Sequence, residues 1–116
     1  MRNFPKVDII MPLYNPNDWV FEAIDSVLNQ TYSNWHFYIV DDFTPQLSDT
    51  LAKVKSFCKT NPKLTFIQLV ENQGPHNALN VGTLAGTGDF LTFIDQDDAW
   101  DYGRLEKSMN LLIKNP

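Results

Sequence analysis

Residues 7–28 read VDIIMPLYNPNDWVFEAIDSVL, an apolar run followed by an amphipathic segment. The apolar run at residues 7–13 ends in the turn residues 14–16, and short apolar runs bounded by turns are typical of buried parallel strands. Beyond the turn, apolar residues recur at helical spacing, and Asn15 or Asn17 can serve as the helix N-cap. This stretch therefore predicts one strand-helix unit of an α/β fold.

The alternation of strand and helix patterns continues along the rest of the chain. The expected elements are a strand at residues 35–40, a helix with the apolar stripe Leu47, Leu51, Val54 and Cys58, a strand at 64–70, a helix at 77–85, a strand at 90–94 and a helix at 102–114 that halts at Asn115-Pro116. Such an order predicts βαβ units, that is, a mostly parallel sheet with helices on both faces. We expect residues 1–116 to form a single domain, with Trp19 and Trp35 in its core.

The composition limits the classes of function. The chain of 116 residues is 43% hydrophobic and can bury a core, while its net charge of −5 argues against binding nucleic acid or an anionic membrane surface. The single cysteine, Cys58, cannot form an internal disulfide, which favours a reduced, buried thiol in the cytosol. No apolar stretch approaches the length of a membrane span, so we expect a cytoplasmic chain without an integral membrane segment.

Polar residues follow each expected strand, where an open parallel sheet binds its ligands. The four positions are Tyr14 and Asn15, Asp41 and Asp42, residues 71–74, and residues 95–98. The last position has three carboxylates in four residues, which repel one another unless a cation or protons neutralise them. Carboxylates completed by water and substrate phosphates suit Mg²⁺ or Mn²⁺. The alternative is a solvated turn in which Asp98 or Asp101 caps the last helix.

The other strand ends are open to two interpretations each. Asp41 and Asp42 either start a turn or accept hydrogen bonds from a base or ribose. The turn at Gly74 precedes a helix whose free N–H groups at Asn77 and Ala78 could meet a phosphate.

Two further side chains near these positions are also ambiguous. His76 is interpreted first as a surface or capping histidine rather than a ligand or base. Trp100 either lines a pocket or packs in the core.

The chain resembles the family 2 glycosyltransferases, which have the GT-A fold. The segments that carry the resemblance are residues 12–15 (PLYN), 26–32 (SVLNQTY), 40–42 (VDD), 71–74 (ENQG), 80–82 (NVG), 88–90 (GDF) and 95–100 (DQDDAW). Each segment is weak by itself, but their order and spacing over nearly the whole chain are specific. The resemblance implies a Rossmann-like fold that binds nucleotide-diphospho-sugars.

In that family a sugar passes from a nucleotide-diphosphate donor, usually a UDP-sugar, to a hydroxyl of a saccharide, lipid or other acceptor. The resemblance implies that Asp42 faces the base, that Asp95 approaches the ribose or the metal, and that Asp97 ligates a Mn²⁺ or Mg²⁺ ion on the diphosphate. The implied nucleotide-sugar-binding residues are Pro12, Tyr14, Asp41, Asp42, Asn72, Gly74, Asn80, Asp95 and Gln96, and the implied metal ligands are Asp97 and Asp95.

The chain departs from the family pattern in two places and in length. Many relatives have Ala-Arg-Asn where residues 78–80 read ALN, so a cationic contact expected in the nucleotide pocket is missing. They also commonly have Asp-Asp-Gly-Ser where residues 41–44 read DDFT, so the loop after the second strand is expected to differ in shape. The family's acceptor-binding region and catalytic base lie beyond residue 116. We therefore expect a truncated donor half, with no catalytic base among its own residues and with any membrane association made through the missing parts.

A phospho-acceptor, receiver-like signalling domain is the alternative, since it shares the length, the α/β order and an acidic Mg²⁺ pocket. That class keeps its acidic pair after the first strand and a lysine after the last. Here the first strand ends in Tyr14 and Asn15, and no fifth strand with a lysine is seen.

Overall fold

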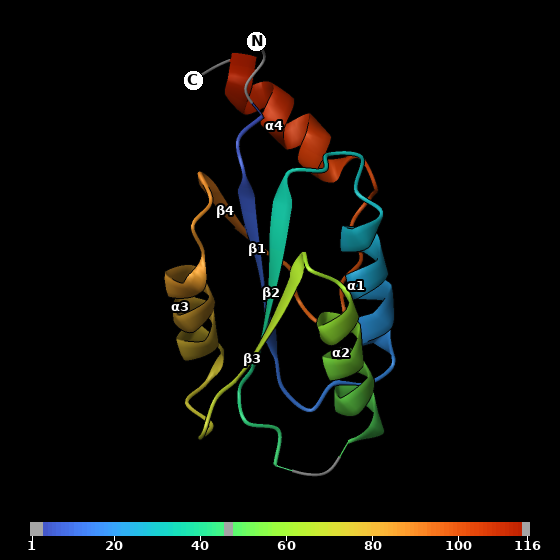
Figure 1. Cartoon of the computed structure of the whole chain (residues 1–116), viewed down its shortest axis with the longest axis vertical. Helices are drawn as coiled ribbons and strands as arrows, with labels where there is room; N and C mark the ends of the chain where they lie inside the picture. Colours follow the sequence, from blue (N-terminus) through green and yellow to red (C-terminus); the bar gives the residue numbers. More distant parts are fainter. Residues whose placement is uncertain (1–3, 46–47, 115–116) are drawn as a thin grey trace.

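The computed structural model describes residues 4–45 and 48–114. Strands and helices alternate along the chain (Figure 1). In chain order they are β1 (Val7–Leu13), α1 (Trp19–Leu28), β2 (Trp35–Asp41), α2 (Asp49–Thr60), β3 (Leu64–Gln68), α3 (Pro75–Ala85), β4 (Phe90–Phe93) and α4 (Arg104–Lys114). The predicted alternation of strands and helices is confirmed.

The four strands form one parallel sheet in the order β3-β2-β1-β4. Val7 at the start of β1 pairs with Trp35 of β2 on one side and with Phe90 of β4 on the other. Because all the strands run the same way, their carboxyl ends meet at one edge of the sheet. The segments after β1, β2, β3 and β4 therefore lie together, as predicted.

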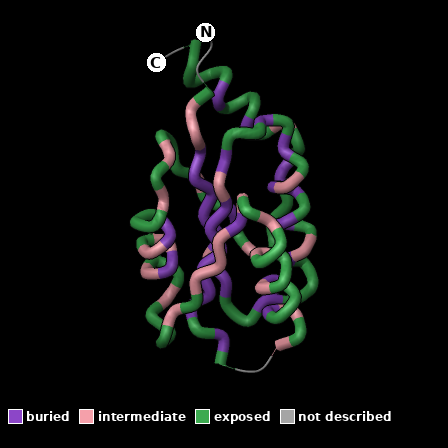
Figure 2. Tube along the Cα trace, viewed as in Figure 1, coloured by how far each residue is buried: buried purple, intermediate pink, exposed green. Residues whose placement is uncertain are grey.

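Helices cover both faces of the sheet, as the sequence predicts. Alternate residues of β1 point to opposite faces: Ile9 packs in a large cluster with α1, α2 and α4, whereas Ile10 packs in a smaller cluster with Ala78 of α3. Figure 1 shows α3 on one side of the sheet and α1 and α2 on the other. β1 and β2 lie between these layers and are buried along nearly their whole length (Figure 2).

Three boundaries differ from the predicted ones by two residues each, and the ends of β2 and β4 differ by one residue. β3 ends at Gln68 rather than residue 70, because Leu69 makes the last hydrogen bond to Asp41 of β2 and Val70 then turns out to solvent, 88% exposed. α3 begins two residues early, with Pro75 in the first turn, where its missing N–H costs nothing. α4 begins at Arg104 rather than residue 102. Leu47, from the predicted stripe of the second helix, lies outside the described residues, as do Asn115 and Pro116, the predicted stop of the last helix.

The core contains Trp35 but not Trp19. Trp35 is buried in the larger cluster, whereas Trp19 is 59% exposed, so the prediction for Trp19 is wrong. Trp19 is the first residue of α1, and the helix turns its next residue, Val20, towards the sheet instead. The predicted N-cap is also displaced: the cap position is Asp18, which makes no capping bond, and the side chain of Asn17 accepts the Trp19 N–H.

Cys58 is a free, half-buried thiol that packs against the larger cluster. Burial raises the pKa of this thiol to about 11, so it stays protonated at neutral pH. A protonated thiol is a poor nucleophile, and Cys58 therefore acts as a packing residue.

Candidate functional site

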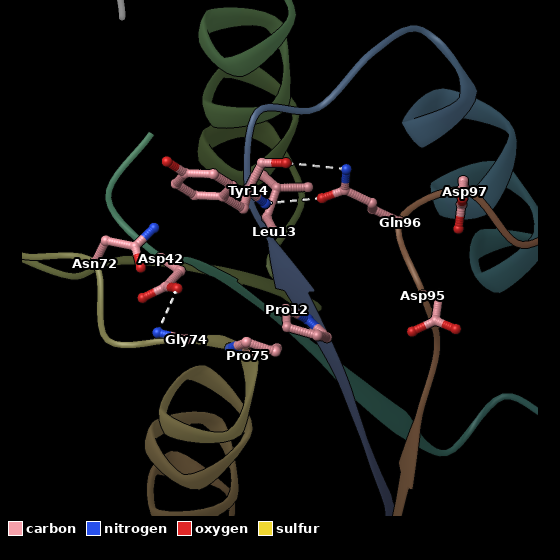
Figure 3. Close-up of a pocket in the computed structure, with 10 residues that line it drawn as sticks. All are labelled: Pro12, Leu13, Tyr14, Asp42, Asn72, Gly74, Pro75, Asp95, Gln96 and Asp97. Atoms are coloured by element: carbon pink, nitrogen blue, oxygen red, sulfur yellow. Dashed lines mark hydrogen bonds between the residues drawn. The ribbon is translucent and has the colours of Figure 1, made fainter. Parts of the chain in front are cut away.

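A cavity of about 500 Å³ lies at the carboxyl ends of the strands. The residues that line it are Pro12, Leu13, Tyr14, Asp42, Asn72, Gly74, Pro75, Asp95, Gln96 and Asp97 (Figure 3). Eight of these ten residues belong to the site predicted from the sequence. Leu13 and Pro75 were missed, although each directly adjoins a predicted residue at the end of a strand or the start of a helix.

Asp41 does not reach this cavity, which corrects the prediction that it binds the nucleotide sugar. Its side chain lies on the same face of β2 as Ile39 and is fully buried. The carboxylate accepts hydrogen bonds from the Thr44 N–H at 3.0 Å, the Thr44 hydroxyl at 2.6 Å and the Gln68 amide at 3.3 Å. Asp41 therefore builds the turn after β2, as its structural interpretation predicts.

Asn80 is also outside the cavity, which corrects a second predicted contact. Ala78 and Gly82 are the buried residues of α3, and Asn80, two positions from each, lies on the exposed side of the helix. A side chain at Gly82 would come within 2.5 Å of Ile10, so α3 lies closely against the sheet. That close packing fixes the rotation of the helix and keeps Asn80 in solvent.

The backbone N–H groups of Asn77 and Ala78 are not free to meet a phosphate. Both donate to the Gly74 carbonyl, at 3.2 and 3.4 Å. The prediction placed the start of the helix at Asn77, but α3 begins at Pro75, so these two groups already belong to its first turn.

Asp42 lines the cavity and also supports the loop between β3 and α3. It is only 3% exposed, and its two carboxylate oxygens accept the N–H groups of Gln73 at 3.0 Å and Gly74 at 2.9 Å. Gly74 has φ +92°, a conformation that glycine adopts at little cost. The carboxylate of Asp42 thus holds one wall of the cavity in place (Figure 3).

The loop after β2 keeps a glycine-like backbone without a glycine. Phe43, at the position where many relatives have Gly, has φ +55°, and its side chain is 42% exposed. For a bulky residue this conformation is strained, and the buried, hydrogen-bonded Thr44 that follows maintains it.

The acidic segment after β4 forms the opposite wall. Asp95 and Asp97 are exposed, and their carboxylates form no hydrogen bond or ion pair within residues 4–45 and 48–114. Asp98 differs, because its carboxylate accepts the Ala99 N–H at 2.9 Å, and it does not line the cavity. Trp100 is buried in the larger core cluster, so its packing interpretation is the correct one.

Neither Asp98 nor Asp101 caps the last helix with its side chain. The first turn of α4 is capped by Gln30, which follows α1: its amide oxygen accepts the Leu105 N–H at 3.0 Å, and its amide nitrogen donates to the Asp101 carbonyl at 2.7 Å. The sequence offered no local signal for this cap, since 75 residues separate Gln30 from Leu105. The alternative interpretation, a turn in which Asp98 or Asp101 caps the last helix, is therefore wrong about the cap.

The acidic wall suits a divalent cation that takes some of its ligands from the protein and the others from a substrate. No group of three or more metal-binding side chains gathers among the described residues. Among the carboxylates that line the cavity, only those of Asp95 and Asp97 have oxygens with no hydrogen-bond partner in the described part of the chain. Mg²⁺ and Mn²⁺ are commonly held by one or two carboxylates, with water and substrate phosphates as the remaining ligands. The donor set therefore fits such an ion.

Gln96 lies between these two aspartates, but its amide contacts the protein itself. The amide oxygen accepts the Tyr14 N–H at 2.8 Å, and the amide nitrogen donates to the Tyr14 carbonyl at 3.1 Å (Figure 3). Gln96 lines the cavity, but both ends of its amide are bonded to the backbone of Tyr14.

Solved structures share this architecture. The S. aureus TarS fragment 1–349 in complex with UDP superposes with a TM-score of 0.84 and 26% sequence identity, covering 94% of this chain and 32% of that one. The mannosyltransferase PcManGT from Pyrobaculum calidifontis, in complex with GDP-Man and Mn²⁺, gives a TM-score of 0.74 at 28% identity, covering 83% of this chain and 28% of the other. The fold is the GT-A type that the resemblance implied.

Curated relatives are similar in sequence. A UDP-Glc:alpha-D-GlcNAc-diphosphoundecaprenol beta-1,3-glucosyltransferase, WfgD, of Escherichia coli is 35% identical over 94% of this chain and 42% of its own length. A putative teichuronic acid biosynthesis glycosyltransferase, TuaG, of Bacillus subtilis is 30% identical over 95% of this chain and 43% of its own length. This chain thus spans less than half of each. The family model Glycosyl transferase family 2 matches residues 8–116, and the chain belongs to this family of glycosyltransferases.

Proposed function

We propose that residues 1–116 form, as one domain, the donor-binding part of a longer enzyme that transfers a sugar from a nucleoside-diphosphate sugar. The observation that carries this proposal is the cavity at the carboxyl ends of the strands. On one wall it has the exposed carboxylates of Asp95 and Asp97, which have no hydrogen-bond partner among the residues that the structure describes. A UDP-sugar is the donor we favour, because TarS was solved with UDP and with UDP-GlcNAc and the name of WfgD includes UDP-Glc.

The nucleoside would bind on the β1 and β2 side of the cavity. Tyr14 is 40% exposed there and offers an aromatic surface, with Pro12 beside it. Each oxygen of Asp42 accepts one backbone N–H, and a carboxylate oxygen can accept a second hydrogen bond, so Asp42 can still accept one from a base N–H. Asn72 and Gly74 would complete this side.

The diphosphate would bind on the acidic side, where Asp97 and Asp95 would hold Mn²⁺ or Mg²⁺. A divalent cation on the diphosphate stabilises the negative charge that develops as the nucleotide leaves. The complex of PcManGT with GDP-Man and Mn²⁺ supports the use of such an ion. The two aspartates would contribute exposed oxygens that, among the described residues, have no competing hydrogen bonds.

The acceptor would be a saccharide or a lipid-linked saccharide, in polysaccharide biosynthesis. The name of WfgD specifies an acceptor on diphosphoundecaprenol, and that of TuaG specifies teichuronic acid biosynthesis. We assign the catalytic base and the acceptor site to parts of the longer protein outside this chain.

Within the described residues, no helix is both long enough and apolar enough to cross a bilayer. A cytoplasmic location, with membrane association through other parts, stays a prediction.

Thermal unfolding with ligands tests the proposal. Mn²⁺ and UDP together should raise the melting temperature more than either alone, because metal and diphosphate share one site. At a concentration 100-fold above Kd, the expected stabilisation is about 2.7 kcal/mol, or on the order of 10 °C for a chain of this size. EDTA should remove the extra shift. A shift with beryllofluoride and none with UDP would instead favour the signalling domain.

A further inference from the structure

The two chain segments that form the acidic side of the cavity separate before they reach it. The Ile94 N–H donates to the Ile10 carbonyl at 3.0 Å, the last backbone hydrogen bond between β1 and the chain leaving β4. β1 then continues to Leu13 without a backbone partner on that side. Asp95 and Gln96 therefore lie beyond the end of the regular pairing.

The side chain of Gln96 bridges this gap. Its amide bonds both the N–H and the carbonyl of Tyr14, at 2.8 and 3.1 Å, and so replaces the backbone pairing that has ended (Figure 3). Only an amide side chain has an acceptor and a donor side by side. Ionised glutamate at this position would lack the donor, and methionine, of similar length, would offer no donor and only a weak sulfur acceptor.

Tyr14 is the fixed partner in this contact. Its two neighbours are tied to the segment after β2: the Leu13 carbonyl accepts the Asp42 N–H at 2.7 Å, and the Asn15 N–H donates to the Thr44 hydroxyl at 3.1 Å. The acidic segment has fewer attachments. Between Ile94 and the buried Trp100, the only bonds that link it to another element are those from Gln96, within the described residues.

We infer that Gln96 is a positioning residue, which holds Asp95 and Asp97 against the end of β1 so that the cation and diphosphate site exists before the ligand arrives. This inference rests on the proposed function and changes the role of Gln96, which the sequence assigned to direct nucleotide-sugar contact. Ordering a segment in advance reduces the entropy lost on binding, so the contact should raise the affinity for the cation and diphosphate. Its hydrogen bonds lie in exposed surroundings, where their loss costs the fold little.

The test compares Gln96→Met with Gln73→Met. Gln73 is exposed and does not line the cavity, and its side chain bonds only to Glu71 within residues 4–45 and 48–114. The same substitution there provides the same chemical change elsewhere. We expect Gln96→Met to weaken binding of UDP with Mn²⁺ about tenfold and to leave binding of UDP without metal unchanged. It should also speed amide hydrogen exchange at Tyr14, which donates to the Gln96 amide, and at Asp98, whose N–H bonds within the acidic segment at 3.1 Å. Gln73→Met should change none of these, and neither variant should lower the melting temperature by more than a few degrees.

The outcomes separate this inference from the function on which it rests. If the unmodified chain does not bind UDP with Mn²⁺, the proposed function fails and the inference fails with it. If the unmodified chain binds and Gln96→Met binds equally well, only the inference is overturned. An equal loss of affinity for UDP with and without Mn²⁺ would also overturn it, since Gln96 would then contact the nucleotide itself or support the fold generally.

Discussion

Two pairs of aspartates flank the end of β1, and their surroundings are opposite. Asp41 and Asp42, at the end of β2, are 0% and 3% exposed, and each of their four carboxylate oxygens accepts a hydrogen bond from a nearby loop. Asp95 and Asp97, after β4, are exposed and have no such partners within the described part of the chain. The first pair supports the turn after β2 and the loop between β3 and α3, whereas the second pair is left available to a ligand.

The comparison shows that burial decides the use of a carboxylate. A buried carboxylate needs hydrogen-bond donors to replace its water, and here backbone N–H groups supply most of them. An exposed carboxylate keeps its water and can exchange it for a cation. Asp42 combines both features, since it supports a loop and still borders the cavity. We therefore expect substitution of an aspartate to lower stability more, the more deeply that aspartate is buried.

Asp41→Ala should have the largest effect on stability. It removes the acceptor of the Thr44 N–H, the Thr44 hydroxyl and the Gln68 amide in a fully buried place. We expect the free energy of unfolding to fall by about 3 kcal/mol, measured by urea denaturation. Asp41→Asn, which retains one acceptor oxygen, should lose less. A loss below about 1 kcal/mol for Asp41→Ala would show that the turn does not depend on this carboxylate.

Asp42→Ala should have an intermediate effect. Two backbone N–H groups, those of Gln73 and Gly74, lose their acceptor, and the loss in stability should be about 2 kcal/mol. Because the loop they belong to borders the cavity, amide exchange at both residues should accelerate and UDP binding should weaken. Unchanged exchange at Gly74 would contradict the supporting role assigned to Asp42.

Asp97→Ala should separate binding from stability. The carboxylate is exposed and makes no hydrogen bond to the part of the chain that the structure describes, so the free energy of unfolding should change by less than about 0.5 kcal/mol. The extra thermal shift produced by Mn²⁺ together with UDP should disappear. Unfolding of this variant at ordinary temperature would instead make Asp97 a structural residue.

Asp98→Ala should have the smallest effect. Asp98 belongs to the same acidic segment, but its carboxylate bonds to the neighbouring Ala99 N–H and does not line the cavity. Both the melting temperature and the Mn²⁺-dependent shift with UDP should stay close to those of the unmodified chain. Loss of that shift would mean that the metal site includes Asp98.

The order of strands and helices could be predicted because the periodicity of apolar residues is a local property. Boundaries were less accurate where a neighbouring strand decides them: Leu69 makes the last bond to β2, so Val70 leaves the sheet despite its apolar side chain. Trp19 was misplaced because a helical stripe does not reveal how the helix is rotated against the sheet.

The sequence by itself determined the α/β alternation, the family resemblance and the strand ends that form the cavity, because each depends on short motifs and their order. Only the tertiary structure decided which of those polar residues face the cavity. Asp41 and Asp42 are adjacent in sequence, yet the alternation along β2 places the first inside the fold and the second at the cavity. Gln96 and Tyr14 are 82 residues apart, and the parallel sheet brings them together.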